Sequence, residues 1–379
     1  MKHLHFTQSL ETLYGGGLGS STVALHKQMR ALGVVSKVCS THGGQAQYPD
    51  GDIFEFERVK PGFIYYAPAM KHAAPELVSQ ADVVHGHGLY TGVNYIMGGE
   101  AIRQEKPFIY HIHGFFEPYI LNRSRWKKRL VHALFEDANF RHVKLLRALT
   151  PVEADQIRVC GLKQPIVVAP NGLDSSSFPK PADPDAPIPT PWVPNLIKRR
   201  FRMLFLGRIH PKKGLDLLTS ALATVPNFAK DWELVIAGPD ELGHLAQVKQ
   251  LVNDLNLADQ VIFTGSISGP AKIALLHSAD VFVLPSYSEG FPMSLLEAAA
   301  CEVPVVATRT CNFPDVSVSE TGWECDPTVA SLAATLSIAL SATVSERKQR
   351  GQNGRRLLEN RYSWASVIKT LSDACKTVC

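Results

Sequence analysis

Cysteine pairs with the spacing of a metal or redox motif are missing from this sequence. Its seven cysteines are odd in number and widely scattered, and no C-x-x-C pair occurs among them. Neither a disulfide framework nor a zinc ribbon is therefore expected. Reduced thiols favour a cytoplasmic location.

A large excess of charge of one sign is missing as well. The chain has 39 Lys and Arg against 35 Asp and Glu, which leaves a net charge of +4. So small an excess gives no electrostatic footprint for nucleic acid, and we expect no nucleic-acid partner. Hydrophobic residues make up 45% and charged residues 20%, a balance that excludes a disordered or fibrous protein.

Long apolar runs are also absent. The longest uncharged stretch, residues 327–345, begins with a proline and carries Leu332, Leu336 and Leu340 at every fourth position. That spacing is typical of an amphipathic helix in a globular protein rather than of a membrane span. The first five residues, MKHLH, reach polar side chains too early for a signal peptide.

Short apolar runs alternate with segments of helical period along most of the 379 residues. Expected strands include 82–85, 203–207 and 281–284, and 214–225 is an expected helix. This alternation predicts an α/β protein in which parallel sheets carry helices on both faces, and the length favours two domains. Ligands of such sheets bind at the carboxyl ends of the strands.

One proline-rich stretch interrupts the alternation. Residues 179–194 contain seven prolines and can be neither helix nor central strand. We interpret 179–197 as a linker between two doubly wound domains, 1–178 and 198–361. A surface excursion within one domain is the alternative.

Glycines are concentrated in residues 13–21, directly after the first expected strand at 4–7. Gly15, Gly16, Gly17 and Gly19 would let a backbone approach a ligand closely, at the N-terminus of the helix that follows. No glycine stands at position 20 and no acidic residue follows the next strand, so the dinucleotide fingerprint is not met. We expect a ligand-binding loop, with a tight turn as the alternative.

Two expected strands end in paired histidines, His85 with His87 and His111 with His113. Alternate residues of a strand share a face, so each pair projects to one side. No acidic residue lies beside either pair. A polar contact with substrate is therefore favoured over a metal site, and structural histidines remain an alternative.

Residues 123–129 carry five cations in seven positions, among them Arg125, Lys127 and Lys128. Such a run is either a solvated helix face or a patch for an anionic acceptor or an acidic lipid surface. The sequence alone does not distinguish the solvated helix face from the binding patch.

Two segments of the second half carry the chemistry of a phosphate and sugar site. Arg208 and Lys213 follow an expected strand and precede a helix, where cations suit a diphosphate. Glu289 lies in a loop after the strand at 281–284, and Glu297 lies further inside the next helix, whose first turn would include Pro292. A carboxylate in that apolar helix requires a partner, which sugar hydroxyls could supply.

These segments resemble the family 4 retaining glycosyltransferases of the GT-B fold. The resemblance rests on the E-x7-E pair Glu289/Glu297 with Gly290-Phe291-Pro292, on Gly207-Arg208 to Lys213-Gly214, on Pro170 to Asp174 and on the glycine-rich N-terminal segment. It implies two Rossmann-like, doubly wound domains that face each other across a cleft. The first would bind the acceptor and the second a nucleotide-sugar donor, and the helix at 362–379 would pack back onto the first domain.

The resemblance also implies roles for single residues. Arg208 and Lys213 would hold the donor diphosphate, Glu289 the donor sugar and Glu297 the ribose, while His113 would lie near the reacting carbon. Catalytic residues would thus be His113, Arg208, Lys213 and Glu289. Further donor-binding residues would be Gly16, Gly17, Gly265, Ser266, Ile267, Gly290, Phe291, Pro292, Met293 and Glu297.

We therefore expect a retaining hexosyltransferase that needs no cofactor and no metal. Its two D-x-D sequences, at 50–52 and 183–185, follow no expected strand. The donor would be a UDP-sugar, UDP-glucose or a relative, with GDP-mannose as the alternative, and the acceptor a saccharide or lipid-linked saccharide of a cell-envelope or exopolysaccharide. A nucleotide-sugar 2-epimerase and a non-enzymatic polysaccharide- or lipid-binding protein are the rivals. The location would be cytoplasmic, with peripheral contact with an acidic membrane left open.

Overall fold

The computed structural model describes residues 1–48, 51–117, 125–198, 200–226 and 228–378. The side chains of residues 12–16, 125, 127 and 229 lie outside this description. The chain divides into two compact units, Met1–Gly172 with Trp364–Cys379, and Leu173–Ser363. Each unit is built around one parallel sheet, which agrees with the alternation of strands and helices in the sequence.

The first unit has a seven-stranded sheet of order β3-β2-β1-β4-β5-β6-β7. Every neighbouring pair is parallel. The strands are β1 (Lys2–Ser9), β2 (Val35–His42), β3 (Ile53–Glu57), β4 (Val83–His87), β5 (Phe108–His111), β6 (Val143–Ala148) and β7 (Ile166–Val168). The order reverses between β1 and β4, as in doubly wound sheets.

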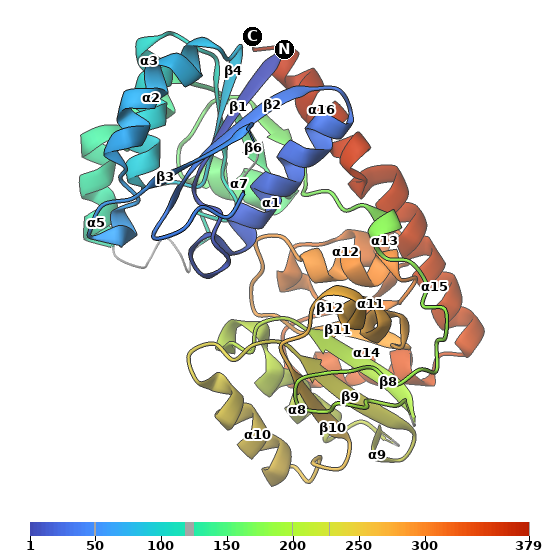
Figure 1. Ribbon diagram of the computed structural model, residues 1–379. Helices are drawn as coiled ribbons and strands as arrows, with labels where there is room; N and C mark the ends of the chain where they lie inside the picture. Colours follow the sequence, from blue (N-terminus) through green and yellow to red (C-terminus); the bar gives the residue numbers. More distant parts are fainter. Residues whose placement is uncertain (49–50, 118–124, 199, 227, 379) are drawn as a thin grey trace. The chain divides into compact units, whose positions relative to one another are not determined.

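Helices cover both faces of this sheet (Figure 1). Apolar side chains of α1 (Thr12–Ala31) and α16 (Trp364–Lys376) form one core cluster with side chains from β4, β5 and β6. The opposite face is covered by α2 (Pro68–Ser79), α3 (Gly99–Arg103), α6 (Asp137–His142) and neighbouring segments. Further helices among the described residues of this unit are α5 (Arg125–Val131) and α7 (Pro151–Val159), with π-helical turns at Asn94–Gly98 and His132–Glu136.

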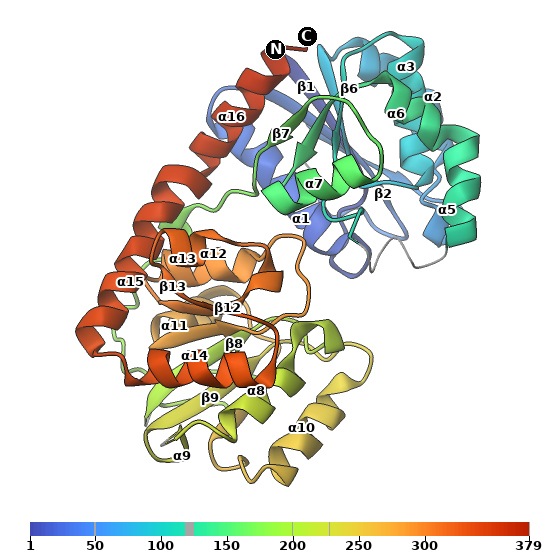
Figure 2. The same cartoon turned by 180° about the vertical axis from the view of Figure 1, so that it is seen from behind.

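The second unit has a six-stranded sheet of order β10-β9-β8-β11-β12-β13, again parallel throughout. Its strands are β8 (Phe201–Leu206), β9 (Trp232–Ala237), β10 (Val261–Gly265), β11 (Val281–Leu284), β12 (Val305–Thr308) and β13 (Gly322–Cys325). Its helices are α8 (Leu215–Leu222), α9 (Phe228–Asp231), α10 (His244–Asp254), α11 (Gly269–His277), α12 (Met293–Ala300), α13 (Asp315–Val318), α14 (Val329–Ser341) and α15 (Val344–Leu357). Figure 2 shows α8 and α14 together on one face of this sheet, with α12 and α13 on the other.

The glycine-rich segment is helical, so the expected loop at 13–21 is wrong. The helix α1 already begins at Thr12 and contains all four glycines. Each glycine costs roughly 0.5–1 kcal/mol relative to alanine in a helix, yet the tertiary fold overrides this preference. At Gly19 the reason is visible, because a Cβ would come within 2.6 Å of the carbonyl oxygen of Ser9.

The proline-rich segment is part of the second unit and not a linker between units. Ile188 and Leu196 exchange two backbone hydrogen bonds, of 2.9 and 3.1 Å, and both side chains are buried in the core of that unit. The division of the chain therefore falls after Gly172. Prolines exclude helix and central strand, but they do not prevent a segment from packing against a sheet edge.

Of the described residues, no single helix is long and apolar enough to cross a bilayer. A stretch passes that test by length and composition only when α14 is joined with the segment Val344–Lys376 across a sharp bend. Of the six described cysteines, Cys160 is exposed and the other five are buried.

Candidate active site

A lysine and a glutamate meet where the strand order of the second unit reverses. β8 and β11 are neighbours in the sheet although they are far apart in the sequence. In the turn after β8, Lys213 Nζ lies 2.6 Å from Oε1 of Glu289, in the loop after β11. Only 16% and 11% of the two side chains are exposed. Sheets of this topology bind their ligands at such a reversal point.

Gly214 allows the two loops to approach each other. Its φ is +66°, and a Cβ at this position would collide with the carbonyl oxygen of Pro285. Just before it, the 3-10 turn Pro211–Lys213 is capped by the imidazole of His210, which accepts the N–H of Lys212 at 3.0 Å. The turn is thus fixed at both ends, and this fixes the direction of Lys213.

Glu289 is held by its side chain and by its backbone. Ser286 Oγ donates to the same Oε1 at 2.5 Å. The backbone N–H of Glu289 donates to the carbonyl of Thr310 at 3.1 Å, and its carbonyl accepts from Asn312 Nδ2 at 2.7 Å. The carboxylate is therefore a preorganised acceptor at the carboxyl edge of the sheet.

Arg208 lies in the same turn but makes a different contact. Its guanidinium pairs with Glu241, with Nη1 at 2.8 and 2.6 Å from the two carboxylate oxygens. The side chains are 62% and 34% exposed. Pairs this exposed contribute about 0–1 kcal/mol, so an incoming anion could replace Glu241 at small cost.

Glu297, the other predicted glutamate, pairs with a lysine that the sequence reasoning missed. Its Oε1 lies 2.8 Å from Nζ of Lys272 on α11. This pair supplies the partner that a carboxylate in an apolar helix requires. Glu297 is the fifth residue of α12, about 6 Å along the axis from Met293.

The segment 290–293 leads into α12. Pro292 is the N-cap residue and not part of the first turn, because its ψ of 79° is not helical. At the start of α12 the N–H groups of Met293 and Leu295 donate to the carbonyls of Phe291 and Pro292, at 3.1 and 3.0 Å, so an anion bound there would replace these contacts. The ring of Phe291 lies 6.3 and 6.1 Å from the rings of Phe313 and Tyr362, which indicates that this side chain packs inside the unit.

The segment Gly265 to Ile267, predicted to bind the donor, begins at the last residue of the edge strand β10. Gly265 has φ +72°, and the indole of Trp192 lies directly over it, 2.9 Å from where a Cβ would be. Lys249 Nζ lies 5.1 Å from the centre of the Trp192 ring. Trp192 comes from the proline-rich segment, so that segment contributes to the surroundings of this loop.

Buried histidines cross the sheet of the first unit in two rows. We call them the histidine grid: His3 and His5 on β1, His85 and His87 on β4, His111 on β5 and His113 just beyond it. One row joins His3, His85 and His111 through contacts of 2.9 Å between ring nitrogens. The other joins His5, His87 and His113 through contacts of 2.9 and 3.0 Å. The strand pairs His5/His85 and His87/His111 are in register, which puts the rings on one face.

Arg147 fixes the direction of the first row. Its Nη1 donates to Nδ1 of His111 at 3.0 Å, and a guanidinium can only donate. The proton of His111 is therefore on Nε2 and points to Nδ1 of His85, and His85 in turn donates to His3. Burial is the main cause that keeps the pKa of His85 and His111 well below the ordinary value, so these rings are neutral.

Two sets of three ring nitrogens in the grid lie within 4.8 Å of one another, His3/His5/His85 and His5/His87/His111. By distance these sets could hold a metal ion. The hydrogen bonds that already join the rings and the positive charge of Arg147 on His111 both oppose a dication there. The expected absence of a metal stays a prediction.

Two known protein families match segments that together include most of the chain. Residues 190–357 match the family described as glycosyl transferases group 1, and residues 15–177 match Glycosyltransferase Family 4. The chain belongs to glycosyltransferase family 4. The family resemblance drawn from Glu289, Glu297 and the Arg208–Lys213 turn is thereby confirmed.

Solved structures agree with this glycosyltransferase fold. The Anabaena protein HepE in complex with UDP superposes with a TM-score of 0.76 at 17% identity and covers 100% of both chains. WaaG, described as a glycosyltransferase involved in lipopolysaccharide biosynthesis, gives a TM-score of 0.70 at 18% identity over 99% of both chains. The predicted GT-B fold with two parallel α/β domains is confirmed.

Curated relatives match the chain over shorter segments. A GDP-mannose-dependent alpha-(1-6)-phosphatidylinositol monomannoside mannosyltransferase of Mycobacterium tuberculosis is 30% identical over 214 residues, which is 52% of this chain and 54% of the relative. A D-inositol 3-phosphate glycosyltransferase of Arthrobacter is 36% identical over 149 residues, 38% of this chain and 34% of the relative. The chain thus spans about half or less of the length of these relatives.

Several residues of the predicted site belong neither to the Lys213–Glu289 pair nor to the histidine grid. Gly16 and Gly17 are in α1, and a Cβ at Gly17 would meet no described atom within 4 Å. Arg125 and Lys127 lie on α5, but their side chains are outside the described ones. Lys128 Nζ lies 5.7 Å from the centre of the Tyr90 ring.

Sequence reasoning missed Ser286, Lys272, Arg147 and two of the six residues of the histidine grid, His3 and His5. Only the last left a usable signal, because His3-Leu4-His5 repeats the H-x-H spacing of the two predicted pairs. Ser286, Lys272 and Arg147 acquire their roles only through contacts between separate elements.

Proposed function

We propose that this glycosyltransferase transfers a hexose, with retention at the anomeric carbon, from a UDP-sugar such as UDP-glucose. The acceptor would be a saccharide or lipid-linked saccharide of a cell-envelope or exopolysaccharide. The observation that carries the proposal is the buried Lys213–Glu289 pair where the strand order of the second unit reverses. The pair places a cation for a diphosphate 2.6 Å from a hydrogen-bond acceptor for sugar hydroxyls.

The chemistry follows from how this pair would separate. When the bond from the sugar to the diphosphate breaks, negative charge grows on the leaving group, and a fixed cation stabilises it most in a water-poor site. Lys213 would exchange Glu289 for the diphosphate, assisted by Arg208 and by the N-terminus of α12. Glu289, still held by Ser286, would then accept from the hydroxyls of the donor sugar, and Glu297 from the ribose.

GDP-mannose is the second candidate donor. The specific observation in its favour is the printed name of the mycobacterial relative, which is 30% identical to this chain. UDP is favoured by HepE, whose similarity covers the whole chain but at 17% identity. The loop at Gly265 to Ile267, with Trp192 over it, is where we expect the two bases to be distinguished.

A panel of nucleotides tests the donor. UDP, GDP, UDP-glucose and GDP-mannose are added in a thermal-shift assay, in which a ligand at 100 times its Kd stabilises by about 2.7 kcal/mol. Release of free nucleotide from the stabilising sugar donor would then support transfer. An epimerised sugar would favour the 2-epimerase, and neither stabilisation nor release would favour the binding protein.

Activity is expected to be independent of divalent metal, because Arg208 and Lys213 supply the positive charge at the diphosphate. Transfer is measured after dialysis against EDTA and again after Mg²⁺ or Mn²⁺ is restored. We expect equal rates. A loss of activity that either ion reverses would contradict this assignment of the two side chains.

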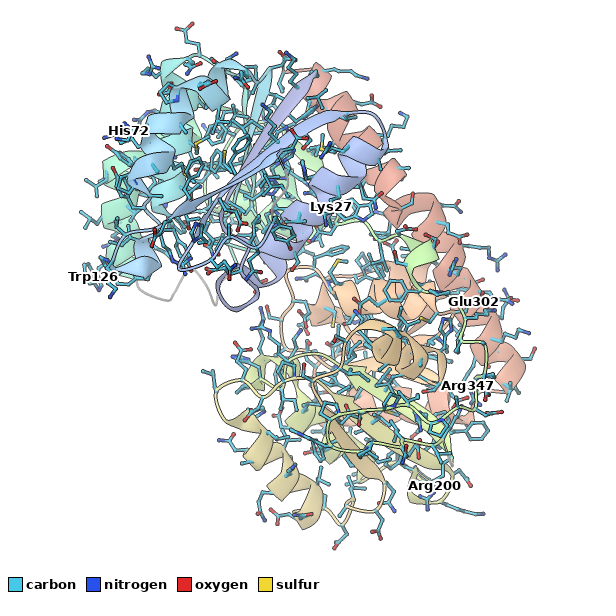
Figure 3. All side chains as sticks on the ribbon, in the orientation of Figure 1. Lys27, His72, Trp126, Arg200, Glu302 and Arg347 are labelled. Atoms are coloured by element: carbon cyan, nitrogen blue, oxygen red, sulfur yellow. The ribbon has the colours of Figure 1, made fainter. Side chains whose placement is uncertain are left out.

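A peripheral membrane-binding surface around residues 123–129 is part of the same proposal. Trp126 and Leu130 on α5 and Leu134 in the next turn recur every four residues, with 67%, 54% and 67% of each side chain exposed. Figure 3 shows Trp126 at the outer surface of the first unit. An apolar stripe beside a run of cations is typical of helices that lie in a membrane interface.

Neutralising Arg125, Lys127 and Lys128 to Gln should weaken binding to anionic vesicles while the donor Kd stays unchanged. Each cation near an acidic surface contributes about 1 kcal/mol, and the loss should be larger at low salt. Cosedimentation with phosphatidylglycerol vesicles measures it. As a control, Lys27, Lys369 and Lys376 are exchanged for Gln, the same change in charge on α1 and α16 of the same unit. Equal losses in both triple variants would contradict a specific surface.

A further inference from the structure

His113 has a backbone conformation that needs support from its surroundings. Its φ is +53°, in the left-handed region that residues other than glycine rarely adopt, and the φ of the next residue, Gly114, is +81°. Such strained residues persist where neighbouring groups over-determine them, and they concentrate at functional sites. The supporting groups at His113 come from strand β4 and from helix α7.

Glu153 supports the backbone. Its Oε1 accepts the N–H of Gly114, and its Oε2 accepts the N–H of Leu149 at 2.5 Å. The carboxylate thus joins the turn after β5 to the turn after β6 through two hydrogen bonds. Only 3% of Glu153 is exposed. Burial raises the pKa of Glu153 to about 7, against the lowering effect of these two N–H donors.

Helix capping explains only part of this arrangement. Thr150 is the N-cap of α7 and accepts the N–H of Glu153, so Thr150 and Glu153 have the spacing of a capping box. In that motif the glutamate satisfies donors at the start of its own helix. The bond to Gly114 serves no helix, and it joins Glu153 to the residue next to His113.

His87 supports the ring. Its Nδ1 lies 3.0 Å from Nε2 of His113, and its Nε2 lies 2.9 Å from Nδ1 of His5. Its ring also stacks on His111, with 4.0 Å between the ring centres. His87 is 2% exposed and held from three directions, so it can fix one orientation of the half-buried His113.

We propose that His87 and Glu153 are positioning residues for His113, with His87 setting the direction of the ring and Glu153 the backbone turn that carries it. The inference rests on the proposed function and on the role that the family resemblance implies for His113, near the reacting carbon of the donor sugar. Burial and the nearby charge of Arg147 lower the pKa of His113 to about 3, so a neutral imidazole is presented. A neutral ring offers one hydrogen bond to the sugar, and that bond depends on the angle of the ring.

His85 provides a matched control for His87. It lies on the same strand and face, is fully buried, and is joined to two other histidines at 2.9 Å each. These contacts belong to the other row of the grid, which does not include His113. Substitutions at His85 therefore measure the cost of disturbing a buried histidine without moving the His113 ring.

The experiment compares two substitutions at each histidine. Asn places an amide near the position of Nδ1, which faces His113 in the case of His87, whereas Gln places it near Nε2, which faces His5. We expect His87→Gln to lower kcat by about 10–100-fold with the nucleotide Kd unchanged, and His87→Asn to restore most of kcat. His85→Gln and His85→Asn should lower the Tm to a similar extent and leave kcat within about threefold. Equal kcat values in His87→Gln and His85→Gln would overturn the role of His87.

The role of Glu153 is tested by comparing a variant of Glu153 with a variant of Thr150, the N-cap of the same helix. Glu153→Gln puts an NH2 group against one of the two N–H donors, while Thr150→Ala removes the cap of α7 without touching Gly114. We expect a fall in kcat for Glu153→Gln alone, accompanied by a shift of the Gly114 amide signal in NMR spectra. A fall of the same size in Thr150→Ala would overturn the role of Glu153.

Two readouts separate this inference from the proposed function. The ¹⁵N signals of the His113 ring should move in His87→Gln and stay in place in His85→Gln, whether or not a donor is turned over. An active wild type with unmoved His113 signals in His87→Gln overturns the positioning role only. A wild type that neither transfers sugar nor releases nucleotide from any donor overturns the proposed function and, with it, the role given to His113.

Discussion

Replacing Lys213 by alanine is expected to lower the turnover number by about 10²–10³, the range for removing one preorganised electrostatic stabiliser. Its side chain is 16% exposed and its ammonium lies 2.6 Å from Glu289, so it acts in a site that water screens poorly. The charge that grows on the leaving diphosphate would find no equal substitute in Arg208, whose side chain is 62% exposed. Turnover at saturating donor measures the effect on the chemical step.

The neighbouring lysine is the control for this prediction. Lys212 belongs to the same 3-10 turn and carries the same charge, but Glu289 pairs with Lys213. Lys212→Ala should keep turnover within a few-fold of wild type. Because Lys213→Ala also leaves a buried carboxylate without its cation, we expect a lower Tm, which Glu289→Gln in the same chain should partly restore. Unchanged turnover in Lys213→Ala would mean that the pair is structural only.

The residues of the Lys213–Glu289 site could be predicted from the sequence, but their contact could not. Both follow apolar runs that form buried strands, and parallel strands bring their carboxyl ends to one edge. That β8 and β11 are neighbours depends on where the sheet reverses its order, which no local pattern records. Lys272 and Glu297 illustrate the same limit, since they lie on two different helices, α11 and α12.

Local propensity misled the sequence interpretation at two segments. Four glycines within 15–19 favour a loop, yet they lie in α1, where Gly19 lets the helix pass close to the end of β1. Seven prolines favour a linker, yet Ile188 and Leu196 pack into the core of the second unit. In both cases tertiary packing decides, and single-residue preferences of about 1 kcal/mol are too small to oppose it.

The histidine grid could be predicted only in part. Each H-x-H pair indicates a shared face, and the third pair at His3 and His5 was open to the same argument. What the sequence cannot supply is the register that brings His87 beside His111 and His111 beside Arg147. Buried arginine on a strand also gives no signal, because such a residue is expected at the surface.

The two glutamates of the E-x7-E pair should differ in which ligand they affect. Glu297→Gln should weaken the binding of free UDP and of the UDP-sugar alike, by roughly 1–3 kcal/mol, because its expected contact is the ribose that both ligands share. Glu289→Gln should spare free UDP and lower transfer, because its expected contacts are hydroxyls of the sugar. Titration calorimetry with both ligands on both variants, together with turnover, measures the difference.

The structure gives this prediction its geometry and its control. Glu289 precedes α12 and is fixed beside Lys213, whereas Glu297 lies about one turn inside the helix beside Lys272. A ligand that spans sugar, diphosphate and ribose can meet both only if its diphosphate lies near the start of the helix. Glu324→Gln is the control, since Glu324 is another largely buried glutamate of this unit, paired with Arg309, and its loss should change the Tm without changing either affinity. If Glu289→Gln weakens free UDP and Glu297→Gln does not, the donor lies in the opposite direction along α12, and Lys272 rather than Lys213 becomes the cation beside the sugar.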